Sequence, residues 1–76
     1  MAAKYITFGK DRYHEHREME QWCAENIGKG QWIMSQFPST WKGMGDLRWT
    51  IHSMFGNTTF AFRSKKDYAM FLLRWS

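Results

Sequence analysis

The amino-acid sequence predicts an α+β fold, a two-layer sandwich with two helices on one face of a four-stranded, mostly antiparallel sheet. Three observations predict it. Apolar positions recur every three or four residues from 12 to 27, β-rich runs flank a glycine turn between 47 and 63, and a capping motif begins at Ser64. With two further short strands, the expected order is β-α-β-β-β-α in a single compact domain of residues 1–76.

The first strand and helix follow from local residue preferences. Residues 4–8 favour a strand that ends at Gly9. The next stretch, 12–27, has no glycine or proline; Asp11 is its expected N-cap, and Gly28 stops it. The expected buried stripe of this amphipathic helix is Tyr13, His16, Met19, Cys23 and Ile27.

Residues 31–37 predict another strand, which Pro38 ends. The following residues, 39–46, form the longest irregular stretch and contain two glycines and Trp41. Loops on a rigid scaffold carry binding residues more often than the scaffold does. This segment is therefore the candidate functional loop.

A hairpin is expected over residues 47–63, with Gly56-Asn57 as its two-residue turn. This turn predicts three cross-strand pairs: Phe55 with Thr58, Ser53 with Phe60, and Ile51 with Phe62. The buried face should then carry Leu47, Trp49, Ile51, Phe55, Phe60 and Phe62. The other face should be solvated and carry Arg48, Thr50, His52, Met54, Thr59, Ala61 and Arg63.

The last helix opens with Ser64-Lys65-Lys66-Asp67, a capping box. Seven of the eight residues from 68 to 75 are apolar, so this helix must be buried on more than one side or dock on a partner. Its sheet-facing residues should include Tyr68, Phe71 and either Trp75 or Leu72, which leaves Met70 and Leu73 partly uncommitted.

Composition excludes several classes of protein. The chain is 43% hydrophobic and 18% aromatic, which is incompatible with intrinsic disorder. Its longest apolar run, residues 68–73, is far shorter than the roughly 20 residues of a membrane span, and no signal peptide is expected. Cys23 is the single cysteine, so no internal disulfide can form and a cytoplasmic location is expected.

No constellation of catalytic or metal-binding residues is expected. The soft metal ligands are His14, His16, Cys23 and His52, and their spacing does not predict a closed zinc site. Cys23 lies in an apolar stripe, which predicts an inert thiol with a raised pKa. The chain is therefore predicted to be no enzyme and to need no metal or cofactor.

The charge pattern favours binding. Residues 39–76 carry the whole excess of four positive charges. Exposed aromatic, Met and Arg side chains are typical of interface centres, and basic groups steer acidic partners. The predicted contact residues for a protein partner are Trp41, Met44 and Arg48, with Arg63, Lys65 and Lys66 steering an acidic surface toward them.

Nucleic-acid binding is the alternative use of the same basic residues. Bases could stack on Trp32 or Trp41, although the expected solvated face of the hairpin has no aromatic ring. Phosphates could contact Arg48, Arg63, Lys65 and Lys66. A small virion or assembly component is a third possibility, which self-association would favour.

The C-terminal segment has a family resemblance. The string Phe60-Ala61-Phe62-Arg63, followed by Lys66-Asp67-Tyr68-Ala69-Met70-Phe71-Leu72-Leu73-Arg74-Trp75, is similar to the end of many small accessory proteins of tailed bacteriophages. The resemblance covers residues 49–75 and implies a non-enzymatic binder that modulates a host or viral protein in the bacterial cytosol. It assigns no functional residue.

Overall fold

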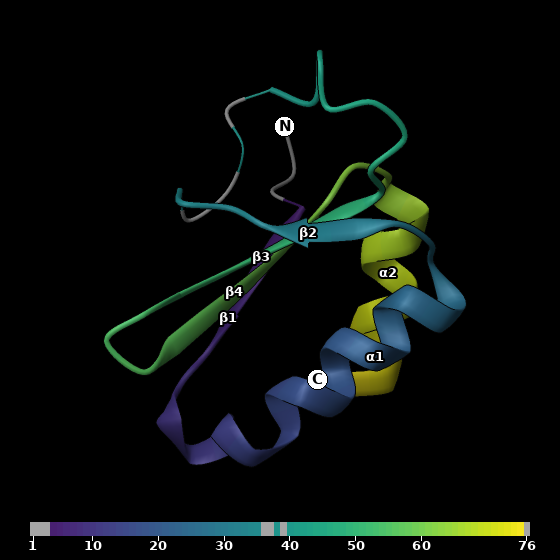
Figure 1. Ribbon diagram of the computed structural model, residues 1–76. Coiled ribbons are helices and arrows are strands. Elements are labelled where there is room, and N and C mark those ends of the chain that lie inside the picture. The colour runs from purple at the N-terminus through teal and green to yellow at the C-terminus, as the bar shows by residue number, and fades with distance from the viewer. Residues whose placement is uncertain (1–3, 36–37, 39, 76) are drawn as a thin grey trace.

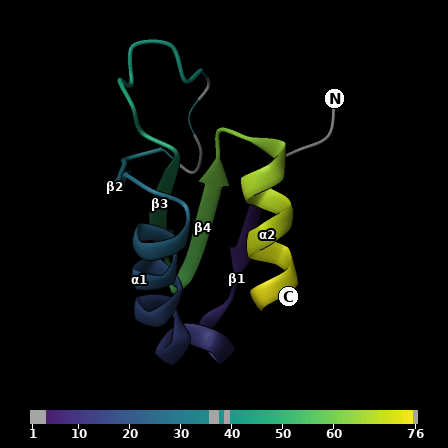
Figure 2. The same cartoon turned by 90° about the vertical axis from the view of Figure 1, so that its right-hand side faces the viewer.

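The computed structural model describes residues 4–35, 38 and 40–75 and confirms the predicted α+β class (Figure 1). The elements are strand β1 (Tyr5–Phe8), the 3-10 helix η1 (Lys10–Glu15), helix α1 (His16–Asn26), strands β2 (Gly30–Trp32), β3 (Trp49–Met54) and β4 (Asn57–Phe62), and helix α2 (Lys65–Trp75). The strand order is β1-β4-β3-β2. Strand β4 is antiparallel to both neighbours, whereas β2 is parallel to β3. Both helices cover one face of the sheet (Figures 1 and 2), which we call the helix face.

The first helical segment is not one continuous helix. Asp11 was expected to be its N-cap, but Asp11 lies inside η1, and neither helix start has a side-chain cap. Arg12 departs from helical geometry and donates to the Glu15 carboxylate (3.1 Å) and the Trp75 carbonyl oxygen (2.6 Å). This bridge to the end of α2 holds the kink, which local preferences do not encode.

The core fills the space between the helix face and the two helices. Strand residues Trp49, Phe60 and Phe62 are buried there, and the Phe71 ring lies 5.1 Å from Phe60 and 4.9 Å from Phe62. Such close, tilted ring pairs add to the stabilisation from buried area. Gly30 of β2 is required beside this core, because a Cβ at that position would collide with the Trp49 indole.

The second strand is shorter than predicted. Strand β2 ends at Trp32, whereas the sequence predicts a strand through residue 37; residues 36 and 37 lie outside the described part. The next carbonyl oxygen, of Ile33, accepts a hydrogen bond from the His52 side chain (3.1 Å). This side-chain contact takes the place of a continued backbone ladder with β3.

The predicted hairpin forms, but its turn and register differ. The turn residues are Phe55 and Gly56, and Met54 pairs with Asn57. Each residue of β3 therefore pairs with a β4 residue two positions earlier than predicted: Ile51, for example, pairs with Phe60 and not with Phe62. A shift of two preserves the face of each strand residue. The division into faces was consequently correct for the strands and wrong for Phe55, which is in the turn.

The face away from the helices, here called the far face, is not the solvated surface that the sequence predicts. Four of its residues are buried: Thr50, His52, Thr59 and Ala61. Met34 and Ser35, which directly follow β2, line a hollow on this side together with His52, and the Ile33–His52 hydrogen bond ties the start of the connecting segment to β3. Alternation along a strand cannot reveal a loop that folds over the polar side.

Helix α2 begins and packs largely as predicted. The Ser64 hydroxyl oxygen accepts the N–H groups of Lys66 (3.1 Å) and Asp67 (3.4 Å), which confirms the cap. The buried Asp67 carboxylate bonds Arg48, however, in place of the return bond of a capping box. Phe71 is buried as expected, and Leu73 is 88% exposed.

Candidate interaction surfaces

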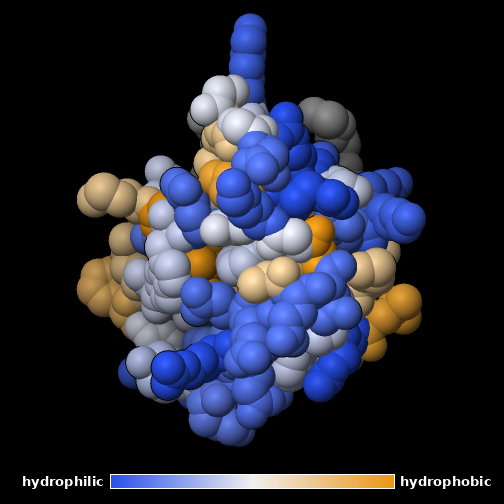
Figure 3. All heavy atoms as spheres, turned by 45° about the vertical axis from the view of Figure 1, so that its right-hand side comes forward, coloured by the Kyte–Doolittle hydropathy of each residue, from blue (hydrophilic) through white to orange (hydrophobic). Residues whose placement is uncertain are grey.

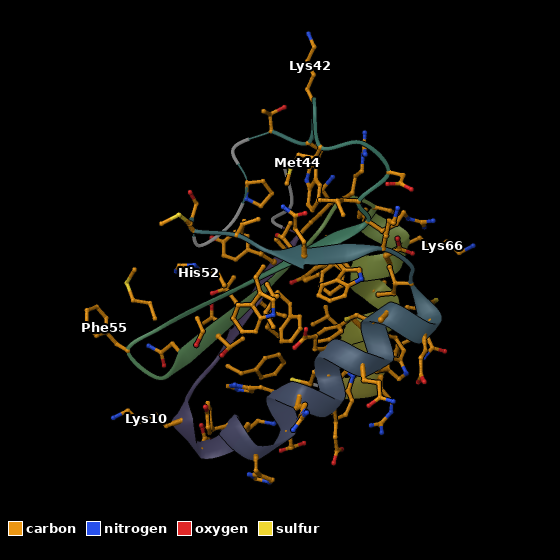
Figure 4. The ribbon with its side chains drawn as sticks, viewed as in Figure 1. Lys10, Lys42, Met44, His52, Phe55 and Lys66 are labelled. Carbon is orange, nitrogen blue, oxygen red and sulfur yellow. The ribbon has the colours of Figure 1, made fainter. Side chains whose placement is uncertain are left out.

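Most of the positive charge lies at one end of the molecule, where β3 begins and β4 ends. We call it the basic end; its residues are Lys4, Lys29, Lys42, Arg48, Arg63, Lys65 and Lys66. Asp46 and Asp67 pair there with Lys29 and Arg48, so these seven basic and two acidic side chains together carry a net charge of +5. Figure 4 shows Lys42 and Lys66 pointing outward from this end. Such a concentration of one sign attracts acidic partners over a distance of about one Debye length, 8–10 Å.

Two of the predicted steering and contact residues already have structural roles. Arg48 donates twice to Asp67 Oδ2 (2.7 and 3.1 Å) and so joins the start of β3 to the first turn of α2. Arg63 donates to the carbonyl oxygens of Gly45 (2.9 Å) and Leu47 (3.4 Å). Both guanidinium groups therefore hold the fold together at the basic end, and their roles in binding stay predictions.

The predicted aromatic loop is only partly available for contacts. Trp41 and Met44 are both half-buried, and the Met44 N–H donates to the Trp41 carbonyl oxygen (3.1 Å) in a local turn. The hydrogen bond from Arg63 to the Gly45 carbonyl oxygen places the end of this loop beside the basic end. The six predicted contact residues therefore lie either in the basic end or in this adjoining loop. The structure thus brings the predicted residues to one end of the molecule without making Trp41 a fully exposed anchor.

The most exposed large apolar side chains lie elsewhere, near the tip of the hairpin. Met34 is 95% exposed, Phe55 87% and Met54 51%, and we call this trio the hairpin-end surface. In Figure 3 apolar spheres project at the side of the molecule where the hairpin tip lies, and Figure 4 shows Phe55 pointing away from the sheet. The trio borders a far-face hollow of about 380 Å³, floored in part by His52 and Thr59.

Phe55 adopts a backbone conformation that large side chains rarely take. Its φ angle is +53°, and that of Gly56 is +84°, as a two-residue hairpin turn with matching twist requires. Glycine or asparagine is favoured at such positions, and a bulky residue there is a true outlier. Phe55 is therefore both strained and exposed, two features that do not help this chain to fold. Sequence reasoning missed it by placing the turn one residue too late.

A second hollow, of about 350 Å³, lies on the helix face beside the end of β2. Its lining includes the exposed rings of Tyr13 and Trp32 and the hydroxyl groups of Ser53 and Thr58. Trp32 Nε1 donates to the Glu20 carboxylate (3.2 Å), so the indole is held in place at the rim.

His16 lies against the helix-face hollow and is buried, as its place in the expected stripe predicts, whereas Tyr13 of that stripe is exposed. Thr58 donates to Ser53 Oγ (3.2 Å), so His16 Nδ1 is the donor to Thr58 (2.9 Å), and Nε2 has no partner among the described residues. Burial lowers the pKa of His16; Arg12 and His14 act in the same direction, and Glu15 and Asp11 oppose them.

The other candidate reactive groups are also committed to the fold. Cys23 is fully buried, and burial raises its pKa to about 12, the direction that its place in the apolar stripe predicts; its inertness stays a prediction. His52 donates to a backbone carbonyl oxygen. Across residues 4–35, 38 and 40–75, His, Cys, Asp and Glu side chains do not gather in the groups of three or more that could hold a metal ion.

Comparisons with protein-family models, with curated proteins and with solved structures find no match to this chain. Neither α1, α2 nor any other helix of the described residues has the length and apolar character needed to cross a membrane. Any function must consequently be inferred from the two surfaces themselves.

Proposed function

We propose that this chain is a non-enzymatic binding protein that docks on another protein through the hairpin-end surface, while the basic end steers the approach of an acidic partner. The resemblance of residues 49–75 to phage accessory proteins supports a host or viral protein as the partner and modulation as the outcome. Binding of this kind requires no catalytic group, which is consistent with the buried state of Cys23 and His16.

The observation that carries the proposal is the state of Phe55. A ring that is 87% exposed on a backbone with a φ angle of +53° is unfavourable in the isolated chain on two separate grounds. Both are explained if the ring is buried against a partner. Aromatic side chains dominate interface energetics, and Met34 and Met54 beside it are adaptable apolar contacts.

The test is affinity capture from a bacterial lysate with the immobilised chain, split into nuclease-treated and untreated halves and washed at high salt. The wild type should retain a stoichiometric protein in both halves. Phe55→Asn should weaken binding of that protein about 30-fold, the effect of losing a roughly 2 kcal/mol anchor. Leu73→Asn is the matched control, because Leu73 is 88% exposed but lies on α2, and it should bind as the wild type does.

Two further outcomes separate the hairpin end from the basic end. Trp41→Ala tests the half-buried loop residue, and a loss of binding equal to that of Phe55→Asn would extend the contact surface to the loop. Equal retention of the captured protein by wild type and Phe55→Asn would contradict docking through the hairpin end. Self-association without any captured protein would instead favour a virion or assembly component.

A second candidate function is sequence-tolerant nucleic-acid binding at the basic end. The observation in its favour is the net charge of +5 at this end, with Lys42 and Lys66 pointing outward (Figure 4). Phosphate contacts release counterions, so affinity for a nucleic acid would fall steeply with salt. Retention that disappears with nuclease or high salt, and that Phe55→Asn leaves unchanged, would support this candidate against the first.

A further inference from the structure

Strand β3 is longer than the strand beside it. Strand β2 ends at Trp32, opposite Ile51, whereas β3 continues to Met54. The last backbone bond along this edge runs from the Ile33 N–H to the Ile51 carbonyl oxygen (3.0 Å). The end of β3, from His52 to Met54, therefore has no strand neighbour on its β2 side among the described residues.

The pairing pattern shows which backbone groups are open there. The Phe62 N–H donates to the Lys4 carbonyl oxygen (2.8 Å), so even-numbered residues of β4 direct their backbone groups toward β1 and odd-numbered ones toward β3. The register pairs those odd-numbered residues with even-numbered residues of β3, which therefore direct their backbone groups toward β4. Odd-numbered residues of β3 direct theirs to the other edge, as the bond from Ile33 to Ile51 confirms. Ser53 is the next odd-numbered residue, and it is exposed. Its N–H and C=O thus point to an open edge.

Hollows flank this open edge on both faces of the sheet. The far-face hollow of about 380 Å³ includes His52, Met54 and Phe55 in its lining, and the helix-face hollow of about 350 Å³ includes Trp32 and Ser53. Consecutive side chains of an extended chain point to opposite faces of a sheet. A strand added beside Ser53 would therefore direct one side chain into one hollow and the next into the other.

We propose that the partner is bound as an extended segment that adds a strand to β3 at Ser53, in the place that β2 leaves open. Two consecutive apolar residues of that segment enter the two hollows, because Met34, Met54 and Phe55 line one and the Trp32 ring lines the other. A helical segment does not fit, since a helix uses its own N–H and C=O groups internally. This inference rests on the proposed docking at the hairpin-end surface and specifies the shape of what docks.

The test uses the full chain and linear eight-residue peptides selected from a random display library, with affinity measured by calorimetry. Hydrogen exchange of single amides is followed by NMR. Saturating peptide should slow exchange of the Ser53 amide at least about tenfold. The Tyr5 amide is the internal control, because Tyr5 lies on β1 at the opposite edge of the sheet, outside the lining of both hollows, and its exchange should not change.

Two variants separate the backbone of Ser53 from its side chain. Ser53→Ala retains the N–H and should bind selected peptides within about twofold of the wild type. Ser53→Pro removes the N–H that faces the open edge and should weaken binding about tenfold, the loss expected for one interfacial hydrogen bond. If Ser53→Pro fails to fold, the peptide provides the same test: N-methylation at the residue that faces Ser53 should abolish binding, and N-methylation of its neighbour should not.

The outcomes distinguish this inference from the proposed function. Peptides that lose affinity with Phe55→Asn but leave Ser53 exchange unchanged, and that tolerate every N-methylation, would overturn strand addition and preserve the docking surface. A library without binders would likewise overturn strand addition, while the lysate capture decides the proposed function separately. Binding that ignores Phe55→Asn in both assays would contradict the proposed function itself.

Discussion

Replacement of Phe55 by asparagine should stabilise the isolated protein. A non-glycine residue in the left-handed region costs roughly 1–2 kcal/mol, and asparagine largely avoids that cost. Since Phe55 is 87% exposed, its lost contacts amount to roughly 0.5 kcal/mol at about 25 cal/mol per Å². The net gain is about 1 kcal/mol, which raises the Tm of a domain of this size by about 4–8 °C.

The assay is thermal unfolding followed by circular dichroism, with urea unfolding as an independent measure of stability. Phe55→Ala is the matched control, because alanine removes the ring but keeps a Cβ at a φ angle of +53°. Its Tm should stay at or below that of the wild type, so the difference between the two variants isolates the backbone strain. A Tm for Phe55→Asn at or below the Tm of Phe55→Ala would refute the argument from strain.

Three further predictions concern groups committed to the fold. Arg48→Ala leaves the buried Asp67 carboxylate without its partner and should lower the unfolding free energy by about 2–3 kcal/mol; adding Asp67→Asn should recover part of this loss in urea titrations. Cys23, with its pKa raised to about 12, should resist iodoacetamide at pH 8 until the chain unfolds, and rapid labelling of the native protein would contradict its burial. Because burial lowers the pKa of His16, the unfolded chain takes up a proton below about pH 6.5 that the folded chain resists. The contribution of His16 to the unfolding free energy should be fully present above that pH and should fall on acidification toward pH 5. The urea midpoint of His16→Gln should therefore change less with pH over this range than the midpoint of the wild type.

The hairpin shows how far local patterns reach. Alternation of apolar and polar residues correctly placed Trp49, Ile51, Phe60 and Phe62 on the helix face, because side-chain direction depends only on position along a strand. The turn was wrong because Gly56 suits either position of a two-residue loop, and asparagine is a better turn former than phenylalanine. Sequence preferences thus favoured the unstrained turn, and the structure has the strained one.

The sequence predicted the positive charge of the candidate site, but it did not predict which large apolar side chains are exposed. Five of the six basic residues of the C-terminal half, all but Arg74, gather as their sequence clustering suggests, and Lys4 and Lys29 join them through tertiary contacts. Exposure of Met34 and Phe55 depends on where β2 ends and where the hairpin turns. The residue preferences of these segments predict neither the end of β2 nor the position of the turn.

What the sequence by itself determined was the class of fold, the strand and helix segments in outline, the helix-face core and the basic character of the C-terminal half. These follow from residue periodicity, capping residues and charge, which act between near neighbours in the chain. Only the tertiary structure decided the strand order, the burial of the far face, the kink at Arg12 and the open edge at Ser53. Each of these depends on groups far apart in sequence, such as Arg12 with Trp75 and His52 with Ile33, whose meeting no local pattern specifies.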